Sequence, residues 1–172
     1  FGRPMLFREE IKEVLETLRS GWWGTGPKTK QFEKLFAKFA HAKFALALSS
    51  CTAATELALD ILGIGPGDEV ITTPLTFVST ANVVLHRGAA VKFADINPET
   101  WNIDPNEIEK VITKKTKAII PVHLHGRPAN LGAISKIAKE NKLYVVEDAA
   151  HAAEAWYHGK KIGSISDFTA FA

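Results

Sequence analysis

The sequence predicts an α/β fold of three layers, α/β/α, in which helices cover both faces of a mainly parallel β-sheet. Short, continuous apolar runs, typical of strands buried on both faces, alternate with helical segments of about 10 to 15 residues. The length of 172 residues fits one domain. With 46% hydrophobic and 23% charged residues, the composition excludes disordered and collagen-like proteins.

Two amphipathic helices are expected before the first strand. Their apolar residues recur at the i, i+3, i+4, i+7 spacing of one helix face. These residues are Ile11, Val14, Leu15 and Leu18 in the first helix and Phe32, Leu35, Phe36 and Phe39 in the second. Residues 21–27 lie between the helices and are rich in Gly and Pro, which indicates a loop.

Five apolar runs are expected to form buried strands. They are residues 44–48, 69–73, 90–94, 118–122 and 143–146. Right-handed crossovers place the carboxyl ends of such parallel strands at one edge of the sheet, where ligands of open α/β sheets bind.

Three helices are expected between these strands. The first begins at Thr52 and is stopped by Gly63. The second follows Asp104, with Pro105 at the first helical position and Glu107 completing a capping box. The third carries the apolar stripe Leu131, Ile134, Ile137 and Ala138. Residues 154–163 are expected to form a polar, solvated hairpin with a His-Gly turn.

Charge and cysteine content exclude several classes of protein. With 21 Lys and Arg against 19 Asp and Glu, the net charge of +2 does not indicate a nucleic-acid or membrane surface. A single cysteine, Cys51, excludes an internal disulfide framework and a CxxC motif. The longest uncharged stretch, residues 70–86, is too polar to span a bilayer, and no signal segment opens the chain. We expect a cytoplasmic protein.

The first candidate site is the junction between the apolar run 44–48 and the following helix. Ser50 and Thr52 place hydroxyls where free N–H groups and the helix dipole attract an anion. An ordinary N-cap is the alternative interpretation. The junction lacks both GxGxxG and GxxxxGK[ST], so dinucleotide or Walker-type phosphate binding is not supported.

The second candidate site closes the strand at 143–146, where Glu147 and Asp148 are followed by His151. A buried ionised carboxylate is costly unless it is paired, so a metal, a protonated ring nitrogen or an arginine is expected beside it. A structural ion pair or a helix cap is the alternative.

Two further features lie at strand ends. His123 and His125 could bind a metal together with Asp148 and His151. Residues i and i+2 of an extended strand face opposite sides, however, and we predict no metal site. Phe77 follows the strand at 69–73 and is either an aromatic plate at the sheet edge or a core residue.

Taken together, an anion cradle, an aromatic plate and a buried acid at one sheet edge fit a flat, cationic heteroaromatic ring that bears a phosphate. Pyridoxal 5'-phosphate is such a molecule. An acid that keeps its pyridine nitrogen protonated lets the ring withdraw electrons from a bond at the substrate α-carbon.

At this point the sequence resembles the DegT/DnrJ/EryC1/StrS family of pyridoxal-phosphate-dependent sugar aminotransferases, which have fold type I. The resemblance covers essentially all 172 residues, in order. The matching segments, each followed by the family's pattern in brackets, are 22–27 (W-x-x-TGP), 49–53 (S-x-GT-A), 74–77 (P-x-TF), 94–96 (V-D-I), 121–126 (PVHLYG) and 147–151 (ED-x-A-[HQ]). It implies that residues 1–172 are the N-terminal part of one cofactor-binding large domain.

The resemblance also implies the roles of individual residues. Asp148 pairs with the pyridine nitrogen, His151 lies near the phenolic oxygen, and both are catalytic. Phe77 stacks on the ring. The residues implied to hold the cofactor phosphate are Ser50, Cys51, Thr52 and Ala53. Those implied to lie near the substrate are Trp22, Thr25, Gly26 and His123.

For the whole enzyme, the resemblance implies that an amino acid, expected to be glutamate, donates an amino group to a nucleotide-linked keto sugar. The active site is then built across a homodimer. The family's Schiff-base lysine would fall beyond Ala172, together with the remaining strands and a C-terminal small domain, so this chain alone is expected to be inactive. Lys160 and Lys161 are not expected to replace that lysine, because their hairpin is predicted to be solvated.

Two positions depart from the family pattern. Cys51 stands where Gly is more common, and a thiol at a helix N-terminus is expected to have a lowered pKa. Arg127 stands where Gln or another polar residue is more common.

Three alternatives remain. The first is a sugar dehydratase of the same family, in which a histidine replaces the lysine. The second is a non-catalytic regulatory or scaffold protein that kept the fold. The third is a Rossmann-type nucleotide binder.

Overall fold

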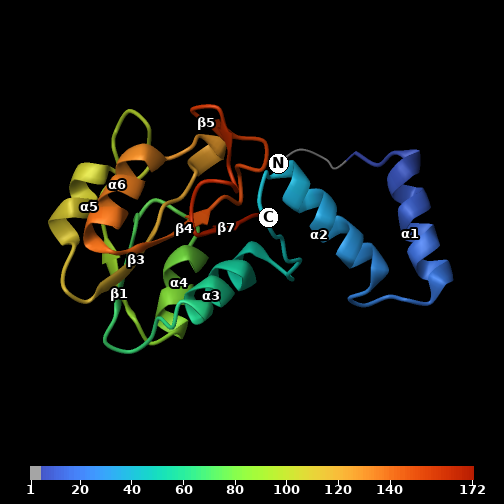
Figure 1. Cartoon of the computed structure of the whole chain (residues 1–172), viewed down its shortest axis with the longest axis horizontal. Helices are drawn as coiled ribbons and strands as arrows, with labels where there is room; N and C mark the ends of the chain where they lie inside the picture. Colours follow the sequence, from blue (N-terminus) through green and yellow to red (C-terminus); the bar gives the residue numbers. More distant parts are fainter. Residues whose placement is uncertain (1–4) are drawn as a thin grey trace. The chain divides into compact units, whose positions relative to one another are not determined.

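The computed structural model describes residues 5–172, which divide into two compact units (Figure 1). The helical unit consists of the described residues up to Phe39 together with Lys43–Ala47. The sheet unit consists of Ala40–Ala42 and Leu48–Ala172. Within residues 5–172, no helix has the length and apolar character needed to cross a membrane.

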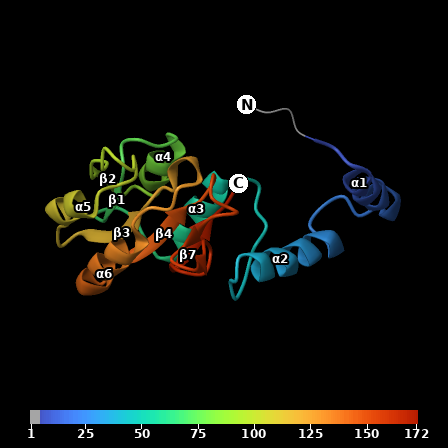
Figure 2. The ribbon, with the colours of Figure 1, turned by 90° about the horizontal axis from the view of Figure 1, so that it is seen from above.

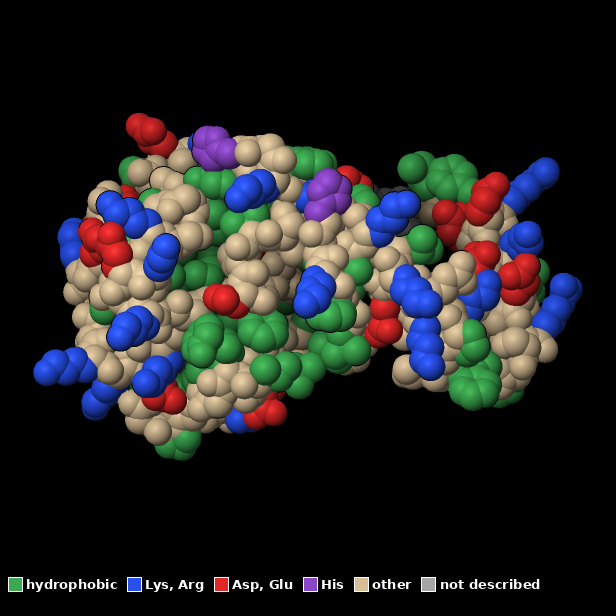
Figure 3. Space-filling model, viewed as in Figure 1, with side chains coloured by type: hydrophobic (Ala, Val, Ile, Leu, Met, Phe, Trp, Pro, Cys, Tyr) green, Lys and Arg blue, Asp and Glu red, His purple; other side chains and the backbone are tan. Residues whose placement is uncertain are grey.

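The helical unit contains the two amphipathic helices that the sequence predicts, α1 (Arg8–Ser20) and α2 (Pro27–Phe39). Gly21, with φ of 70°, ends α1 in the left-handed conformation that glycine adopts without strain. The ammonium of Lys28 in α2 pairs with both Glu13 and Glu16 of α1. The apolar stripes of both helices stay partly or largely exposed, and hydrophobic side chains are visible on the surface of this unit (Figure 3).

The sheet unit is built on five parallel strands in the order β2-β1-β3-β4-β7. Their bounds are β1 Glu69–Thr72, β2 Ala90–Phe93, β3 Thr116–Ile120, β4 Tyr144–Asp148 and β7 Phe168–Ala170. The parallel sheet predicted from the apolar runs is therefore confirmed.

Helices cover both faces of this sheet, which confirms the three layers (Figures 1 and 2). The helices α3 (Cys51–Ile61) and α4 (Ser79–His86) cover one face, and α5 (Pro105–Val111) and α6 (Leu131–Asn141) cover the other.

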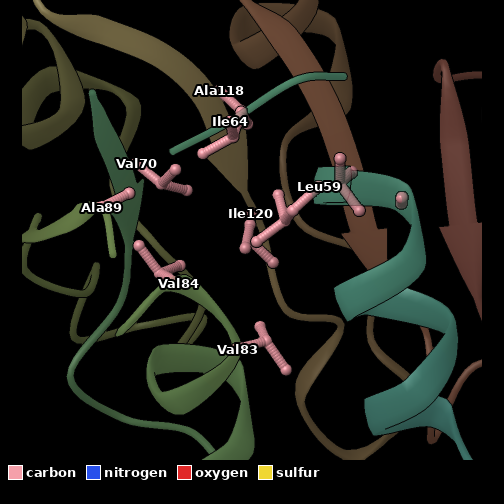
Figure 4. Packing of buried hydrophobic residues seen from close by; sticks show 10 residues of the cluster. Leu59, Ile64, Val70, Val83, Val84, Ala89, Ala118 and Ile120 are labelled. Carbon is pink, nitrogen blue, oxygen red and sulfur yellow. The ribbon is translucent and has the colours of Figure 1, made fainter. Parts of the chain in front are cut away.

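Each face has its own apolar core. Figure 4 shows the first, in which Leu59 of α3 and Val83 and Val84 of α4 meet Val70 and Ile120 of the sheet. In the second core, Ile134, Ile137 and Ala138 of the predicted α6 stripe pack on Ile71, Ile119 and Val145, while Leu131 packs in a separate cluster with Ile162. The first core fixes α3 and α4, which carry residues of the candidate site.

The segment 44–48, predicted as a strand, forms neither helix nor strand and pairs with no strand within residues 5–172. Its larger side chains are exposed, with 79% exposure for Phe44 and 65% for Leu46. The amide of Ala47 donates to Glu33 Oε1 at 3.0 Å instead of to a neighbouring strand. The prediction was wrong because an apolar run forms a strand only where a neighbouring edge accepts its hydrogen bonds.

The capping box predicted for α5 is only half present. The side chain of Asp104 accepts a hydrogen bond from the Asn106 amide at 2.9 Å, as an N-cap residue does. Glu107 does not reach back to the Asp104 amide, because that amide already donates to Asp95 O at 2.9 Å. The Glu107 carboxylate accepts a hydrogen bond from Lys110 at 2.6 Å instead.

The predicted hairpin is present as β5 (Trp156–Tyr157) and β6 (Lys160–Lys161), and His158 and Gly159 both have positive φ in its turn. The prediction that the whole hairpin is solvated was wrong for Lys161, whose side chain is 3% exposed. Its ammonium lies 3.2 Å from Glu154 Oε2 and 5.4 Å from the centre of the Trp156 ring. These contacts satisfy the buried charge.

Replacing Ile134 by Ala is expected to lower the free energy of unfolding by about 2–5 kcal/mol, because Ile134 is fully buried in the core between α6 and the sheet. Replacing Lys136, which is exposed on the same helix, by Ala is expected to change it by less than about 0.5 kcal/mol. Chemical denaturation of both variants measures the difference. Equal losses would show that this face of α6 is not packed as described.

Candidate active site at the carboxyl edge of the sheet

The candidate residues of the sheet unit gather at the carboxyl edge, as the strand topology predicts. The chain leaves β1 through residues 73–77 into α4, leaves β3 through residues 121–123, and ends β4 at Asp148. Because all five strands are parallel, these exits lie at one edge. The N-terminus of α3 reaches the same place, since Cys51 Sγ lies 3.8 Å from Asp148 Oδ1.

Asp148 is a buried carboxylate, 8% exposed, at the centre of this group. Its Oδ2 accepts a hydrogen bond from Thr80 Oγ1 at 2.8 Å, and its Oδ1 accepts one from the Ala150 amide at 3.3 Å. No lysine, arginine or histidine among residues 5–172 forms an ion pair with it. A buried charge normally has such a partner, so the site is chemically matched to a cationic ligand.

The N-terminus of α3 offers backbone donors beside Asp148. Ser50 is the N-cap and its side chain accepts a hydrogen bond from the Ala53 amide at 3.1 Å, so the N-cap interpretation of this junction is confirmed. The amides of Cys51 and Thr52 have no acceptor within the described part of the chain. Capping and anion binding are therefore compatible at this helix end, because two donors remain available.

The Cys51 thiol does not have the lowered pKa expected for a helix N-terminus. Burial of the thiol, and next the negative charge of Asp148, raise the pKa of Cys51 to about 12. Both effects disfavour the thiolate and outweigh the helix dipole. Cys51 is therefore a protonated neighbour of Asp148 and not an activated nucleophile.

Phe77 is not a core residue. Its side chain is 74% exposed, just before α4. The Phe77 carbonyl accepts the Thr80 amide at 3.1 Å, and the Thr76 and Thr80 hydroxyls lie 2.8 Å apart. One turn of chain thus carries both an exposed aromatic ring and the hydroxyl that binds Asp148.

His151 is exposed and stacks on His125, with ring centres 6.0 Å apart and planes 5° from parallel. Gly126 lets the backbones of these two loops come close together. It has a φ of 82°, and a Cβ atom there would lie 2.9 Å from the His151 carbonyl oxygen. The loop after β3 is therefore tied to the loop after β4.

His123 is fully buried, in contrast to the accessible place that a substrate contact requires. Its Nε2 lies 2.6 Å from Glu147 Oε2, and its Nδ1 accepts the Ala129 amide at 3.0 Å. Both ring nitrogens are thus in use inside the protein. Any effect of His123 on a ligand is exerted through these neighbours.

Trp22, Thr25 and Gly26 belong to the helical unit, and their substrate contacts remain a prediction. Locally they form one turn, in which the Trp22 indole donates to Thr25 O at 3.0 Å. A Cβ atom on Gly26 would lie 2.0 Å from Trp22 Nε1, so only glycine fits under the indole.

Sequence reasoning missed the role of Thr80 beside Asp148. The signal was available in the i, i+4 spacing of Thr76 and Thr80, which places two hydroxyls on one side of a helical turn. The roles of Glu147 and His123 as each other's partner had no local signal, because 24 positions separate them in the sequence.

The arrangement fits the cofactor that the sequence suggests. Among residues 5–172, the buried Asp148 carboxylate has no cationic partner and two amides at the N-terminus of α3 have no acceptor, while the Phe77 ring is exposed. A protonated pyridine ring bearing a phosphate is complementary to all three. Within residues 5–172, no three His, Cys, Asp or Glu side chains are grouped as metal ligands.

Comparisons with known proteins identify similar sequences and structures. The sequence model of the DegT/DnrJ/EryC1/StrS aminotransferase family matches residues 4–172. The spore coat polysaccharide biosynthesis protein SpsC of Bacillus subtilis is 54% identical over 171 residues, which are 99% of this chain and 44% of SpsC. The chain thus spans less than half the length of this relative.

Two solved structures are also similar over nearly the whole chain. An aminotransferase from Psychrobacter cryohalolentis has a TM-score of 0.95 and 40% identity, covering 99% of this chain and 44% of that one. The pyridoxal-phosphate form of Spr1654 of Streptococcus pneumoniae, assigned by its name to the sugar aminotransferases, has a TM-score of 0.97 and 37% identity, covering 100% of this chain and 48% of that one.

Iodoacetamide is expected to alkylate Cys51 at pH 8 at least about a hundredfold more slowly than a free cysteine, because the raised pKa leaves little thiolate. Mass spectrometry of the Cys51 peptide measures the rate. Asp148→Asn is expected to speed the alkylation, because it removes the negative charge that helps to raise the pKa of Cys51. Asp68→Asn, which lies in the loop before β1, serves as the control. A wild-type rate equal to that of a free thiol would contradict this description of the site.

Proposed function

Because the chain belongs to the DegT/DnrJ/EryC1/StrS aminotransferase family, we propose that it forms part of a pyridoxal 5'-phosphate-dependent sugar aminotransferase. The reaction moves an amino group from an amino acid, glutamate, to a keto group of a nucleotide-linked sugar. The observation that carries the proposal is the buried Asp148 carboxylate, which has hydrogen-bond donors but no cationic partner among residues 5–172.

The role proposed for Asp148 follows from its surroundings. Pyridoxal phosphate, when bound, supplies an electron sink for breaking a bond at the substrate α-carbon. Asp148 holds the proton on the ring nitrogen, because a buried carboxylate and a protonated ring stabilise each other. The Thr80 hydroxyl fixes the Asp148 Oδ2 atom in place.

The other residues of the site are proposed to bind and orient the cofactor. The amides of Cys51 and Thr52, with the hydroxyls of Ser50 and Thr52, bind the phosphate at the N-terminus of α3. Ala53 contributes to the turn, since its amide already donates a hydrogen bond to Ser50 Oγ. The exposed Phe77 ring stacks on the pyridine, and His151, held by the stacked His125, hydrogen-bonds the phenolic oxygen.

The substrate side of the proposal draws on a relative. The name of the Bacillus subtilis relative refers to spore coat polysaccharide biosynthesis, which supports a sugar substrate. Contacts from Trp22, Thr25 and Gly26, a homodimer, a cytoplasmic location and the inactivity of this chain alone stay predictions. A dehydratase of the same family would use the same residues, and an assay for loss of a sugar hydroxyl distinguishes it.

In the full-length protein, we expect added pyridoxal phosphate to give a visible absorbance band that borohydride fixes, and glutamate to discharge it. Subsequent addition of a nucleotide-linked keto sugar is expected to restore the band. A protein without such a band would support the non-catalytic alternative.

Asp148→Asn is expected to lower kcat by at least about a hundredfold while the protein stays folded, because the neutral amide keeps the Thr80 hydrogen bond but cannot stabilise a protonated ring. Asp68→Asn is the matched control and should retain its activity. A near-normal kcat in Asp148→Asn would remove Asp148 from its proposed role.

Phe77→Ala is expected to weaken cofactor binding by roughly fivefold, because the stacked ring contributes on the order of 1 kcal/mol. Fluorescence titration of the apoprotein with pyridoxal phosphate measures the Kd. Phe44→Ala removes an equally exposed ring from the helical unit and is the control. An unchanged Kd in Phe77→Ala would exclude the stacking role.

A further inference from the structure

Directly before Asp148, the side chain of Glu147 lies in a buried network that joins three parts of the sheet. Its Oε2 is 2.6 Å from His123 Nε2, after β3, and its Oε1 accepts the Thr169 hydroxyl of β7 at 3.1 Å. Glu147 and His123 are both 0% exposed. The carboxylate thus ties the end of β4 to its neighbours on both sides.

The hydrogen bonds define the proton positions in this network. The Ala129 amide donates to His123 Nδ1, so the ring carries its own proton on Nε2. The Nε2–H group donates a hydrogen bond to Glu147 Oε2. Both Glu147 oxygens then accept hydrogen bonds, from His123 and from Thr169, which is the pattern of an ionised carboxylate.

The same strand end presents Asp148 on the opposite face. Successive residues of a strand point to opposite sides, and the contacts agree. Glu147 binds His123 and Thr169, whereas Asp148 binds Thr80 of α4. The backbones are also linked, because the His123 amide donates to Asp148 O at 3.0 Å. A shift of the Glu147 network therefore moves Asp148.

We propose that Glu147 and His123, completed by Thr169, are positioning residues that hold the Asp148 carboxylate against Thr80 and Cys51. The proposal rests on the proposed function, in which Asp148 faces the cofactor ring nitrogen. A buried charged group contributes little net stability compared with apolar residues of the same volume. Its value here is the fixed geometry that it gives to the end of β4.

Two substitutions of His123 in the full-length protein separate its two hydrogen bonds. His123→Gln places an amide nitrogen near the Nε2 position and keeps a donor for Glu147. His123→Asn reaches only the Nδ1 position, so it keeps the acceptor for the Ala129 amide and loses the bond to Glu147. The proposal requires these two variants to differ, whereas a role in stability alone predicts similar effects.

The first readout needs no cofactor, because Cys51 reports on the charge of Asp148 3.8 Å away. His123→Asn and the isosteric Thr169→Val are expected to let Asp148 move and to speed Cys51 alkylation at pH 8 by at least about threefold. His123→Gln is expected to stay within about twofold of wild type. Val145→Ala, which opens the core on the same strand without touching the network, controls for loss of stability.

The second readout uses the cofactor-loaded full-length protein. His123→Asn and Thr169→Val are expected to raise the pH midpoint of the visible absorbance change by at least about 0.5, because a less firmly protonated ring withdraws less charge. They are expected to lower kcat at least about tenfold with little change in KM. His123→Gln is expected to resemble wild type.

Equal alkylation rates and equal midpoints in the Asn and Gln variants would overturn the positioning role, as would variants that change only the unfolding temperature. Absence of a cofactor band in the wild type would contradict the proposed function instead. In that case the alkylation rates still decide whether the network positions Asp148.

Discussion

The structure depends on one constraint, a carboxylate buried at the end of a parallel strand with no cation among residues 5–172 to balance it. Asp148 is held there by the Thr80 hydroxyl and the Ala150 amide. These neutral donors compensate only part of the cost of removing a charge from water. A site that keeps such a charge is organised for a positively charged ligand.

The fold supports this arrangement from one side of the sheet. Helices α3 and α4 pack on the sheet through a shared apolar core and bring Cys51 and Thr80 to Asp148. The face of the sheet toward α5 and α6 carries the second core. The Glu147–His123 pair lies past this core, at the carboxyl ends of β3 and β4. The two adjacent acids of β4 thus have different tasks because strand geometry turns them to opposite faces.

The sequence was sufficient to predict what is periodic or local. The stripe of α6, the parallel direction of the strands and the convergence of Asp148 and the α3 turn at one edge all follow from spacing and topology. The prediction failed where the presence or absence of a specific partner determines the structure. Residues 44–48 have the composition of a strand but no strand pairing within residues 5–172. Lys161 is buried because Glu154 and Trp156 satisfy its charge.

The same distinction applies within the site. A helix N-terminus alone lowers a thiol pKa, but burial and the charge of Asp148, 97 positions away in sequence, raise that of Cys51. His123 belongs to a matching segment near the proposed substrate site, yet Glu147 and Ala129 occupy both of its nitrogens. The motifs correctly place both residues at the carboxyl edge of the sheet. The protonation of Cys51 and the burial of His123, however, are determined by contacts with residues far away in the sequence.

The central claim is that Asp148 holds a protonated ring nitrogen. The most direct measurement is the 15N chemical shift of pyridoxal phosphate labelled at its ring nitrogen and bound to the full-length protein. Our account predicts a protonated nitrogen in the wild type near neutral pH and an unprotonated one in Asp148→Asn. An unprotonated nitrogen in the wild type, or the same shift in both proteins, would contradict it.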